Sequence, residues 1–433
     1  MVKVVEIVTI SKLVPVFKEG AEANAIQVAK FNFEDGGECG FNVIAQKGLY
    51  EVGSKAIYIQ PDYCLSENEL FNSFIAPGGD PKKSRLGKQN RIRAIKFNFS
   101  FEGSSDPIYS NGILMPLEEV KNFLVKKITE ETDLAEELGV TKYVAIDKPD
   151  NNRSGLTKGD LPDFLYATDE TRIENIKEHV NLVFNGDEEI SFTLKHDGSS
   201  TTIYVKFEGD LLQGICSRNK EKVIEQEMAT NYIDVDGVHL HRYSMKNGDV
   251  YTKGWINDVS GKFYTDEEVN ELSLLPITVE VRDTFVDTVK KHNYLEKLKI
   301  YCIDNNVQLA LRGELVGGNG GSKGSGNKLN NDAKGDSKVV WFGVDDLQFG
   351  KAQRLNYSSV HNLKSVCEKL EFEYTKPIFV GKLDYDGIIK MGNDIFKEYK
   401  EKYNHIIEGI VIRTTNSNKL SCKYLNLEYD SKH

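Results

Sequence analysis

Charged residues stand inside or beside apolar, strand-like runs in the second half of the chain, and this pattern most constrains the fold. Glu314 lies within "LRGELVG" (311–317), Glu408 opens a strand in "IEGIVIR" (407–413), and Lys423 lies within "KLSCKYLN" (419–426). A charged side chain in a buried strand is costly unless it meets a partner, a metal ion or a ligand. These runs therefore predict strands that bring their charges together around one anionic ligand.

The stretch "LKHDGSSTTIYV" (194–205) places Lys195 and Asp197 on a Gly-Ser turn just before another strand. A lysine acts as a nucleophile only when its amine is neutral, which requires nearby cations or desolvation to lower its pKa. Gly198 would let the backbone turn tightly and approach a ligand. Taken alone, the four residues Lys-His-Asp-Gly are better explained as a solvated hairpin end. Arg218, in "CSRNK" (216–220), adds a cation at the end of a strand.

Composition limits the class of protein. A chain of 433 residues predicts two domains, and its 39% hydrophobic content is enough for sizeable cores. The net charge of -11 argues against a surface coated with non-specific nucleic-acid contacts. The six cysteines form no Cys-x-x-Cys pair, which disfavours a zinc site or a disulfide framework and favours reduced, buried thiols. Without a signal peptide or a long apolar run, we expect a soluble, cytoplasmic monomer with no membrane contact.

The organisation along the chain changes twice. Short β-rich runs up to about residue 120 predict a small closed barrel of the OB type, with an SH3-like barrel as the alternative. Residues 121–165 predict a helical linker, and residues 166–433 a mixed second domain. Within that domain, 224–280 and the Gly-rich loop 317–338 are interpreted as insertions, and a helix is predicted from Thr284 to Asn305. The N-terminal runs are "VVEIVTI", "IQVAKFNF", "FNVIAQKG", "KAIYIQPDYCL" and "RIRAIKF".

A basic segment, "KKSRLGKQNRIRAIK" (82–96), contains no acidic residue. On an acidic protein it predicts a local contact for a phosphodiester backbone, although a solvated loop explains it equally well. The chain contains no Walker-type phosphate loop, so a P-loop kinase or helicase is disfavoured. The predicted RNA-binding residues of this segment are Lys82, Lys83, Arg85, Lys88, Arg91 and Arg93.

In their order along the chain, these motifs resemble the six nucleotidyltransferase motifs of the ATP-dependent ligase and mRNA-capping superfamily. The motif set is Lys195-His196-Asp197-Gly198, Ser217-Arg218, Gly313-Glu314, Trp341 to Asp345, Glu408-Gly409 and Lys423. Within the superfamily the chain resembles the Naegleria-type RNA ligases, also through "RIRAIKF" and "SNGILMPL" in the first domain and "ATDETRIEN" (167–175). The resemblance implies an α+β protein, with an N-terminal OB-like β-barrel followed by a nucleotidyltransferase (ATP-grasp-like ligase) domain of antiparallel sheets and helices.

The resemblance also implies a reaction and its residues. Lys195 would attack the α-phosphate of ATP, the AMP would move to an RNA 5′-phosphate, and a 3′-OH would then seal the break. The bound metal would be Mg²⁺ or Mn²⁺, held through waters by Asp197, Glu314 and Glu408. Lys423 would hold the α-phosphate and lower the pKa of Lys195. The full set implied to contact ATP or phosphate groups is Arg172, Arg218, Glu314, Lys423 and Lys419.

Several alternatives stay open on sequence alone. Arg172 could instead pair with Asp169 or Glu170, and Lys419 could be an exposed turn lysine. Trp341 and Phe342 could stack on adenine or belong to the core. The chain departs from the family at Val344, where many RNA ligases have phenylalanine, and at Ser421, where the last motif commonly begins with lysine.

Three other functions are compatible with the motifs: a GTP-dependent capping enzyme, a DNA ligase, and a non-catalytic RNA-binding protein built on a decayed ligase. Both enzyme alternatives are expected to carry an OB domain after the last motif. Only about ten residues follow Lys423. The joint presence of Lys195, Asp197, Glu314, Glu408 and Lys423 argues against decay.

Overall fold

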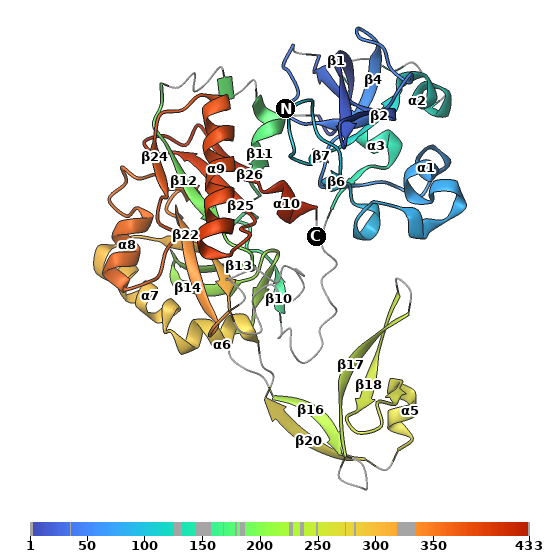
Figure 1. Ribbon diagram of the computed structural model, residues 1–433. Coiled ribbons are helices and arrows are strands. Elements are labelled where there is room, and N and C mark those ends of the chain that lie inside the picture. The colour runs from blue at the N-terminus through green and yellow to red at the C-terminus, as the bar shows by residue number, and fades with distance from the viewer. Residues whose placement is uncertain are drawn as a thin grey trace.

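The chain is an α+β protein built mainly from antiparallel sheets (Figure 1). Its six cysteines are all buried, and none forms a disulfide. In the described part of the chain, no helix combines the length and apolar character needed to cross a membrane. The computed structural model describes residues 3–34, 36–124, 128, 132–143, 157–167, 169–177, 180–181, 187–224, 228–233, 238–247, 250–272, 274–280, 283–317 and 334–431.

The N-terminal region forms a five-stranded, nearly closed barrel-like sheet in the order β3-β2-β1-β4-β8. Its fifth strand is β8, from "NGILMPL", and not the predicted "RIRAIKF". The run in β8 is continuously apolar and buried, whereas "RIRAIKF" alternates with cations and forms only a short strand, β6, paired with β7. The strands are β1 (Val5–Lys18), β2 (Ala21–Asn32), β3 (Val43–Gln46), β4 (Lys55–Ile59), β6 (Ile95–Phe97), β7 (Ile108–Ser110) and β8 (Ile113–Pro116).

Part of the predicted linker 121–165 packs onto this N-terminal core. Leu134, Leu138 and Val140 are buried in the same cluster as Val5 and Ile57. Residues 134–140, which follow the barrel in sequence, therefore contribute to the core of the N-terminal region. The predicted domain boundaries stay a prediction. The elements here are β5 (Tyr63–Cys64), α1 (Asn72–Ile75), α2 (Leu117–Leu124), α3 (Ala135–Leu138) and β9 (Thr141–Lys142), with 3-10 turns at Glu69–Phe71, Pro77–Gly79, Pro81–Lys83 and Lys88–Asn90.

A seven-stranded sheet in the order β10-β15-β14-β13-β21-β22-β23 forms the centre of the second region. One face is apolar, because Ile203, Leu311 and Trp341 are fully buried in one cluster. This cluster includes residues of α6 (Thr284–Lys291), α7 (Tyr294–Asn305) and α8 (Leu363–Leu370). The strands are β10 (Thr157–Asp160), β13 (Ser199–Glu208), β14 (Asp210–Cys216), β15 (Lys220–Lys222), β21 (Leu309–Val316), β22 (Lys338–Asp346) and β23 (Gln353–Arg354).

The sequence predicted one continuous helix over 284–305, but the structure has two helices there. The chain forms α6 (Thr284–Lys291) and α7 (Tyr294–Asn305), because Asn293 adopts the left-handed conformation with φ of 55°. A residue in that conformation ends a right-handed helix. Val289 of α6 and Leu295 and Leu298 of α7 are buried in the core.

A second, five-stranded sheet has the order β11-β26-β25-β12-β24. Its apolar face packs against the long helix α9 (Tyr385–Tyr403), where Phe192, Ile410 and Tyr424 meet Ile388. The remaining elements here are β11 (Thr171–Arg172), a 3-10 turn (Ile173–Ile176), β12 (Ile190–Lys195), α8 (Leu363–Leu370), β24 (Phe379–Gly381), β25 (Gly409–Thr414), β26 (Ser421–Leu425) and α10 (Leu427–Asp430).

The segment interpreted as an insertion at 224–280 builds a five-stranded sheet of its own, which lies at the bottom of Figure 1, apart from the other sheets. Most of the Gly-rich loop predicted at 317–338 lies outside the described residues. The elements of this sheet are β16 (Met228–Ile233), β17 (His239–Asn247), β18 (Val250–Asn257), β19 (Phe263–Tyr264), α5 (Asp266–Asn270) and β20 (Leu275–Glu280).

Candidate active site

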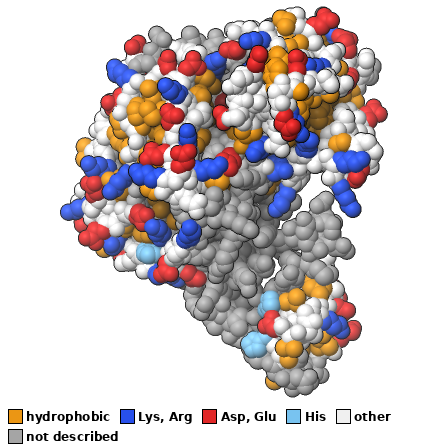
Figure 2. All heavy atoms as spheres, viewed as in Figure 1, with side chains coloured by type: hydrophobic (Ala, Val, Ile, Leu, Met, Phe, Trp, Pro, Cys, Tyr) orange, Lys and Arg blue, Asp and Glu red, His pale blue; other side chains and the backbone are white. Residues whose placement is uncertain are grey.

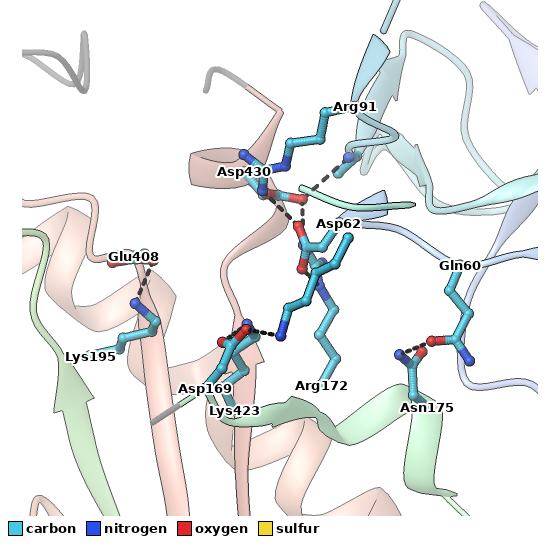
Figure 3. A network of polar contacts seen from close by, with 12 residues as sticks. Gln60, Asp62, Arg91, Asp169, Arg172, Asn175, Lys195, Glu408, Lys423 and Asp430 are labelled. Carbon is cyan, nitrogen blue, oxygen red and sulfur yellow. Dashed lines mark hydrogen bonds and ion pairs between the residues drawn. The ribbon is translucent and has the colours of Figure 1, made fainter. Parts of the chain in front are cut away.

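Lys195 is the last residue of β12 and lies opposite Gly409, the first residue of β25. This register places Glu408 beside the lysine, and Lys195 Nζ lies 2.6 Å from Glu408 Oε1 (Figure 3). Both side chains keep partial access to solvent. The two motifs are more than 200 residues apart in the sequence, and the strand pairing joins them in one site.

The electrostatic environment of Lys195 opposes its role as a nucleophile in the ligand-free protein. Burial lowers its pKa, but the carboxylates of Glu408, Glu314 and Asp197 outweigh burial, so the pKa lies above the ordinary value of lysine. The net shift is upward, and the lowering expected of Lys423 stays a prediction. Neutralising the three carboxylates would remove the interactions that keep the amine protonated.

Gly198 is needed for close packing between two strands. A side chain at this position would bring its Cβ to 2.3 Å from the carbonyl oxygen of Leu315 and 2.9 Å from Glu314 Cγ. The structure shows a close approach to β21, and the predicted approach to a ligand stays a prediction. The register of β13 on β21, with Ser200 opposite Glu314, brings Glu314 to the site.

The predicted metal ligands Asp197, Glu314 and Glu408 gather around Lys195 without forming a ready-made cage. All three carboxylates act on the pKa of the lysine, and Asp197 is buried. Among the described residues, no three acidic, histidine or cysteine side chains lie close enough together to hold an ion directly. Oxygen donors spread around one point fit Mg²⁺ or Mn²⁺ bound largely through water, because Mg²⁺ gives up its water reluctantly.

Tyr429 is a site residue that the sequence analysis missed. It lies on α10, and burial together with Glu408 and Asp197 raises its pKa far above the ordinary value. Its hydroxyl forms a hydrogen bond with the Asp197 carboxylate, for which the tyrosine is the donor. No motif marks this residue, because the contact depends on where the C-terminal helix folds back.

The polar face of the five-stranded sheet continues from Lys195 to Lys423. Thr193 and Lys423 both lie opposite Val411, and neighbours across strands share a face. Two residues further along, Arg413 donates to Ser421 Oγ at 3.0 Å. Lys195, Lys423 and Arg413 therefore lie on one face of one sheet.

A pocket of about 310 Å³ lies at the Arg413 end of this face. Phe342 lines it, whereas Trp341 is fully buried in the opposite core. The sequence left open whether these two aromatic residues stack on a base or belong to the core. Trp341 is a core residue, and Phe342 is available to a ligand. The lining also includes Tyr166, Asp169, Glu170, Arg354, Asn356, Tyr357 and Ser421.

Arg172 lies in a buried ion network between the N-terminal and second regions (Figure 3). Its Nε and Nη2 donate to the two carboxylate oxygens of Asp62 at 2.8 and 3.0 Å, and Nη2 also lies 3.2 Å from Asp430 Oδ2. Arg91 joins the same two carboxylates, at 2.6 Å from Asp62 and 3.7 Å from Asp430. Neither predicted partner, Asp169 or Glu170, holds Arg172, and its role in phosphate binding stays a prediction.

The other predicted phosphate ligands differ in exposure. Lys419 pairs with Glu188 at the surface, which matches the alternative of an exposed turn lysine. Arg218 is more than half exposed and contacts Asp169. In the basic segment, Lys82, Lys83, Arg85 and Lys88 are exposed, whereas Arg91 and Arg93 are partly buried. Figure 2 shows Lys and Arg side chains along the lower edge of the N-terminal region.

Glu174 provides a pH-dependent prediction near this network. Burial raises the pKa of its carboxyl to about 7, because Arg172 only partly offsets the loss of water. An acid with a raised folded-state pKa binds more protons when folded, so its contribution to stability is lost as pH rises through 7. We expect Glu174→Gln to raise the melting temperature at pH 8 more than at pH 5. Equal shifts at the two pH values, measured by calorimetry, would contradict this assignment.

Comparison with known proteins gives structural matches only. No protein-family model matches the chain, and no curated protein matches it in sequence. A lysine-to-methionine variant of Naegleria gruberi RNA ligase with AMP and Mn matches at a TM-score of 0.62 and 19% identity, over 99% of this chain and 98% of that one. The chain shares the fold of Naegleria gruberi RNA ligase.

Two further structures of that ligase extend the match over the whole chain. A lysine-to-alanine variant with ATP and Mn has a TM-score of 0.63 and 19% identity, covering 100% of this chain and 99% of that one. The ligase with PPi has a TM-score of 0.63 and 18% identity, covering 100% and 98%. The α+β architecture predicted from the ordered motifs is confirmed.

Proposed function

We propose that the protein is an ATP-dependent RNA ligase that seals 3′-OH and 5′-phosphate ends. The observation that carries this proposal is the meeting of Lys195 and Glu408 across β12 and β25, with Asp197 and Glu314 around them. A half-buried lysine amid three carboxylates suits covalent nucleotidyl transfer. The shared fold with a ligase whose structures hold ATP, AMP, PPi and Mn supports this choice.

In the first step, the neutral amine of Lys195 attacks the α-phosphate of ATP. A nitrogen–phosphorus bond forms, the bond to the bridging oxygen breaks, pyrophosphate leaves with the electron pair, and the amine loses its proton. Lys423, on the same sheet face, neutralises charge on the α-phosphate. The pocket at the other end of this face has the volume of a small-ligand site and presents Phe342 to the base.

The second and third steps transfer AMP to the RNA. A 5′-phosphate oxygen displaces the lysine, forming a pyrophosphate linkage to AMP, and the 3′-OH then attacks that phosphate and releases AMP. Asp197, Glu314 and Glu408 are the residues that would hold Mg²⁺ or Mn²⁺. When bound, the metal would neutralise charge on the phosphate and on these carboxylates.

The test is direct. The wild-type protein incubated with α-labelled ATP and magnesium is expected to carry label after denaturation, and to release it when a nicked duplex with RNA at the 3′-OH side is added. Label from GTP but not from ATP would point to a capping enzyme. If neither ATP nor GTP labelled the protein, the alternative of a non-catalytic RNA-binding protein would be favoured.

The exposed part of the basic segment predicts where RNA binds. Lys82→Gln combined with Lys83→Gln is expected to weaken binding of a nicked duplex and to reduce the slope of log K against log salt by about 0.7–0.9 per lost phosphate contact. Binding titrations at several salt concentrations measure both quantities. The matched control neutralises Lys364 and Lys369 on α8, which lies on the opposite side of the molecule (Figure 1). If both double variants lost the same amount of affinity for the nicked duplex, the basic segment would not be a specific RNA-binding site.

A further inference from the structure

The five-stranded sheet of the 224–280 segment, which we call the insertion sheet, carries a hairpin with an uneven charge. The two strands of this hairpin, β17 and β18, contain Arg242, Lys246 and Lys253 and no acidic residue. The helix of the same segment, α5, carries three acidic residues in its first turn, and the whole chain has a net charge of -11. The cations of the hairpin therefore form a local exception on an acidic protein.

The register of the hairpin places all three cations on one face. Arg242 lies opposite Trp255, Lys253 lies opposite Ser244, and Lys246 lies opposite Tyr251. Opposite residues of an antiparallel pair share a face, and so do alternate residues of one strand. We call this face the cationic face. The other face of the hairpin carries His241, Tyr243, Met245, Asn247, Val250, Thr252, Gly254 and Ile256.

The two ends of the cationic face have different neighbours. At one end α5 packs against β18 and β19, and Trp255 Nε1 donates to Asp266 Oδ1 at 2.8 Å. The Trp255 ring also meets the Tyr232 ring edge-on, with 4.9 Å between the ring centroids. Trp255 therefore belongs to the core of the insertion sheet. Beyond it, toward the turn of the hairpin, lie Ser244, Lys246, Tyr251 and Lys253.

A buried ion pair holds the place where the insertion sheet joins the second region. Lys222, the last residue of β15, has its Nζ 3.1 Å from Asp283 Oδ2, and both side chains are buried. Asp283 also caps α6 by accepting from the backbone N–H of Phe285. Because Lys222 is only four residues after Arg218, the insertion sheet begins close to the proposed active site. From there, in the view of Figure 1, the hairpin extends toward the N-terminal region.

The dimensions and residue types of the cationic face suit a nucleic-acid backbone. Arg242 and Lys246 are four residues apart on one strand, which is about 13 Å at the usual rise per residue. A duplex carries about one negative charge per 1.7 Å of its axis, so this length spans several phosphates. Lysine, arginine, serine and tyrosine side chains all bind phosphate or sugar oxygens, and duplex RNA is bound mainly through such contacts.

We propose that the cationic face of the β17–β18 hairpin binds the phosphate backbone of the RNA duplex beside the break that is sealed. This inference rests on the proposed function and assigns the insertion sheet to substrate binding. The contact does not depend on base sequence, because phosphates carry no sequence information. Together with the basic segment 82–96, the hairpin holds the RNA from a second part of the protein while its 5′-phosphate end lies at Lys195.

The first test combines Lys246→Gln with Lys253→Gln in the full chain. The affinity for a nicked RNA duplex with long arms is expected to fall about tenfold or more, and the slope of log K against log salt to decrease by about 0.7–0.9 per lost contact. Binding titrations at several salt concentrations measure both quantities. The control is the Lys364→Gln and Lys369→Gln double variant on α8, which removes the same charge and is expected to keep the wild-type affinity.

The second test separates the reaction steps in the same variant. Labelling by α-labelled ATP is expected to proceed at the wild-type rate, since no RNA takes part in that step. In sealing of a nick adenylylated in advance, the KM for the nick should rise while kcat stays unchanged, as expected when ground state and transition state lose the same contact. Lys246→Glu combined with Lys253→Glu should raise this KM further, because the new carboxylates repel the phosphates.

The possible results distinguish the hairpin contact from the proposed function. An unchanged affinity and salt slope in the hairpin variants, or an equal loss in the α8 variant, would overturn the inference. Loss of the ATP label in the hairpin variants would overturn it as well, because the hairpin would then act on the nucleotide step. Absence of label in the wild type would instead refute the proposed function, and the binding titrations would still show whether the hairpin contacts RNA.

Discussion

Replacing Lys195 by methionine is expected to abolish the covalent AMP label completely. The amine forms the bond to phosphorus, and Lys195 lies at the junction of Glu408, Glu314 and Asp197. Lys195→Arg is the matched variant, because it keeps the positive charge beside Glu408 but stays protonated. Both variants are expected to remain unlabelled with α-labelled ATP, as read on a denaturing gel.

The two variants are expected to differ in stability. Lys195→Met leaves the half-buried Glu408 without its cation, so its melting temperature should fall, whereas Lys195→Arg should stay close to the wild type. Label that persists in either variant would place the nucleophile elsewhere and remove the basis of the proposed function. Both variants should still seal a nick adenylylated in advance, although more slowly, because that step does not use the amine as nucleophile.

Arg172→Met is expected to lower the free energy of unfolding by about 3–5 kcal/mol, the usual cost of removing one partner from a buried ion pair. The guanidinium is 2% exposed and holds both Asp62 and Asp430. Its loss leaves Arg91 as the partner of two buried carboxylates from opposite ends of the chain. Denaturant titration measures the change, and Arg85→Met, at an exposed position of the basic segment 82–96, is the control.

The destabilisation by Arg172→Met should also depend on pH. Burial raises the pKa of Asp62, but Arg172 and Arg91 outweigh it and hold the pKa below the ordinary range. An acid with a depressed folded-state pKa contributes stability above its unfolded pKa and loses that contribution as pH falls. The difference in the free energy of unfolding between the wild type and the variant should therefore be largest at neutral pH and should decrease below about pH 4. An unchanged free energy of unfolding combined with lost ATP binding would instead assign Arg172 to the nucleotide.

Residue types and motif order predicted which charged residues meet, but not how the chain brings them together. Glu314 and Glu408 stood out because a charge in an apolar strand demands a partner, and Lys195 because of its place in the ordered motifs. The sheet register brings the three together, and their role in catalysis stays a prediction. The order of motifs also predicted the α+β architecture. The interruption at Asn293 and the use of "NGILMPL" as the fifth barrel strand were missed, since both depend on tertiary packing rather than on local periodicity.

What the sequence determined by itself is which residues carry reactive and charged groups and in what order, because those follow from side-chain chemistry and motif spacing. Only the tertiary structure decided which charges face one another. Arg172 turned to Asp62 and Asp430, Tyr429 reached Asp197, and Asp169 came to lie among three cations. The partners in these contacts come from strands and helices distant in sequence, and electrostatic energy depends on their separation in space, which no local pattern encodes.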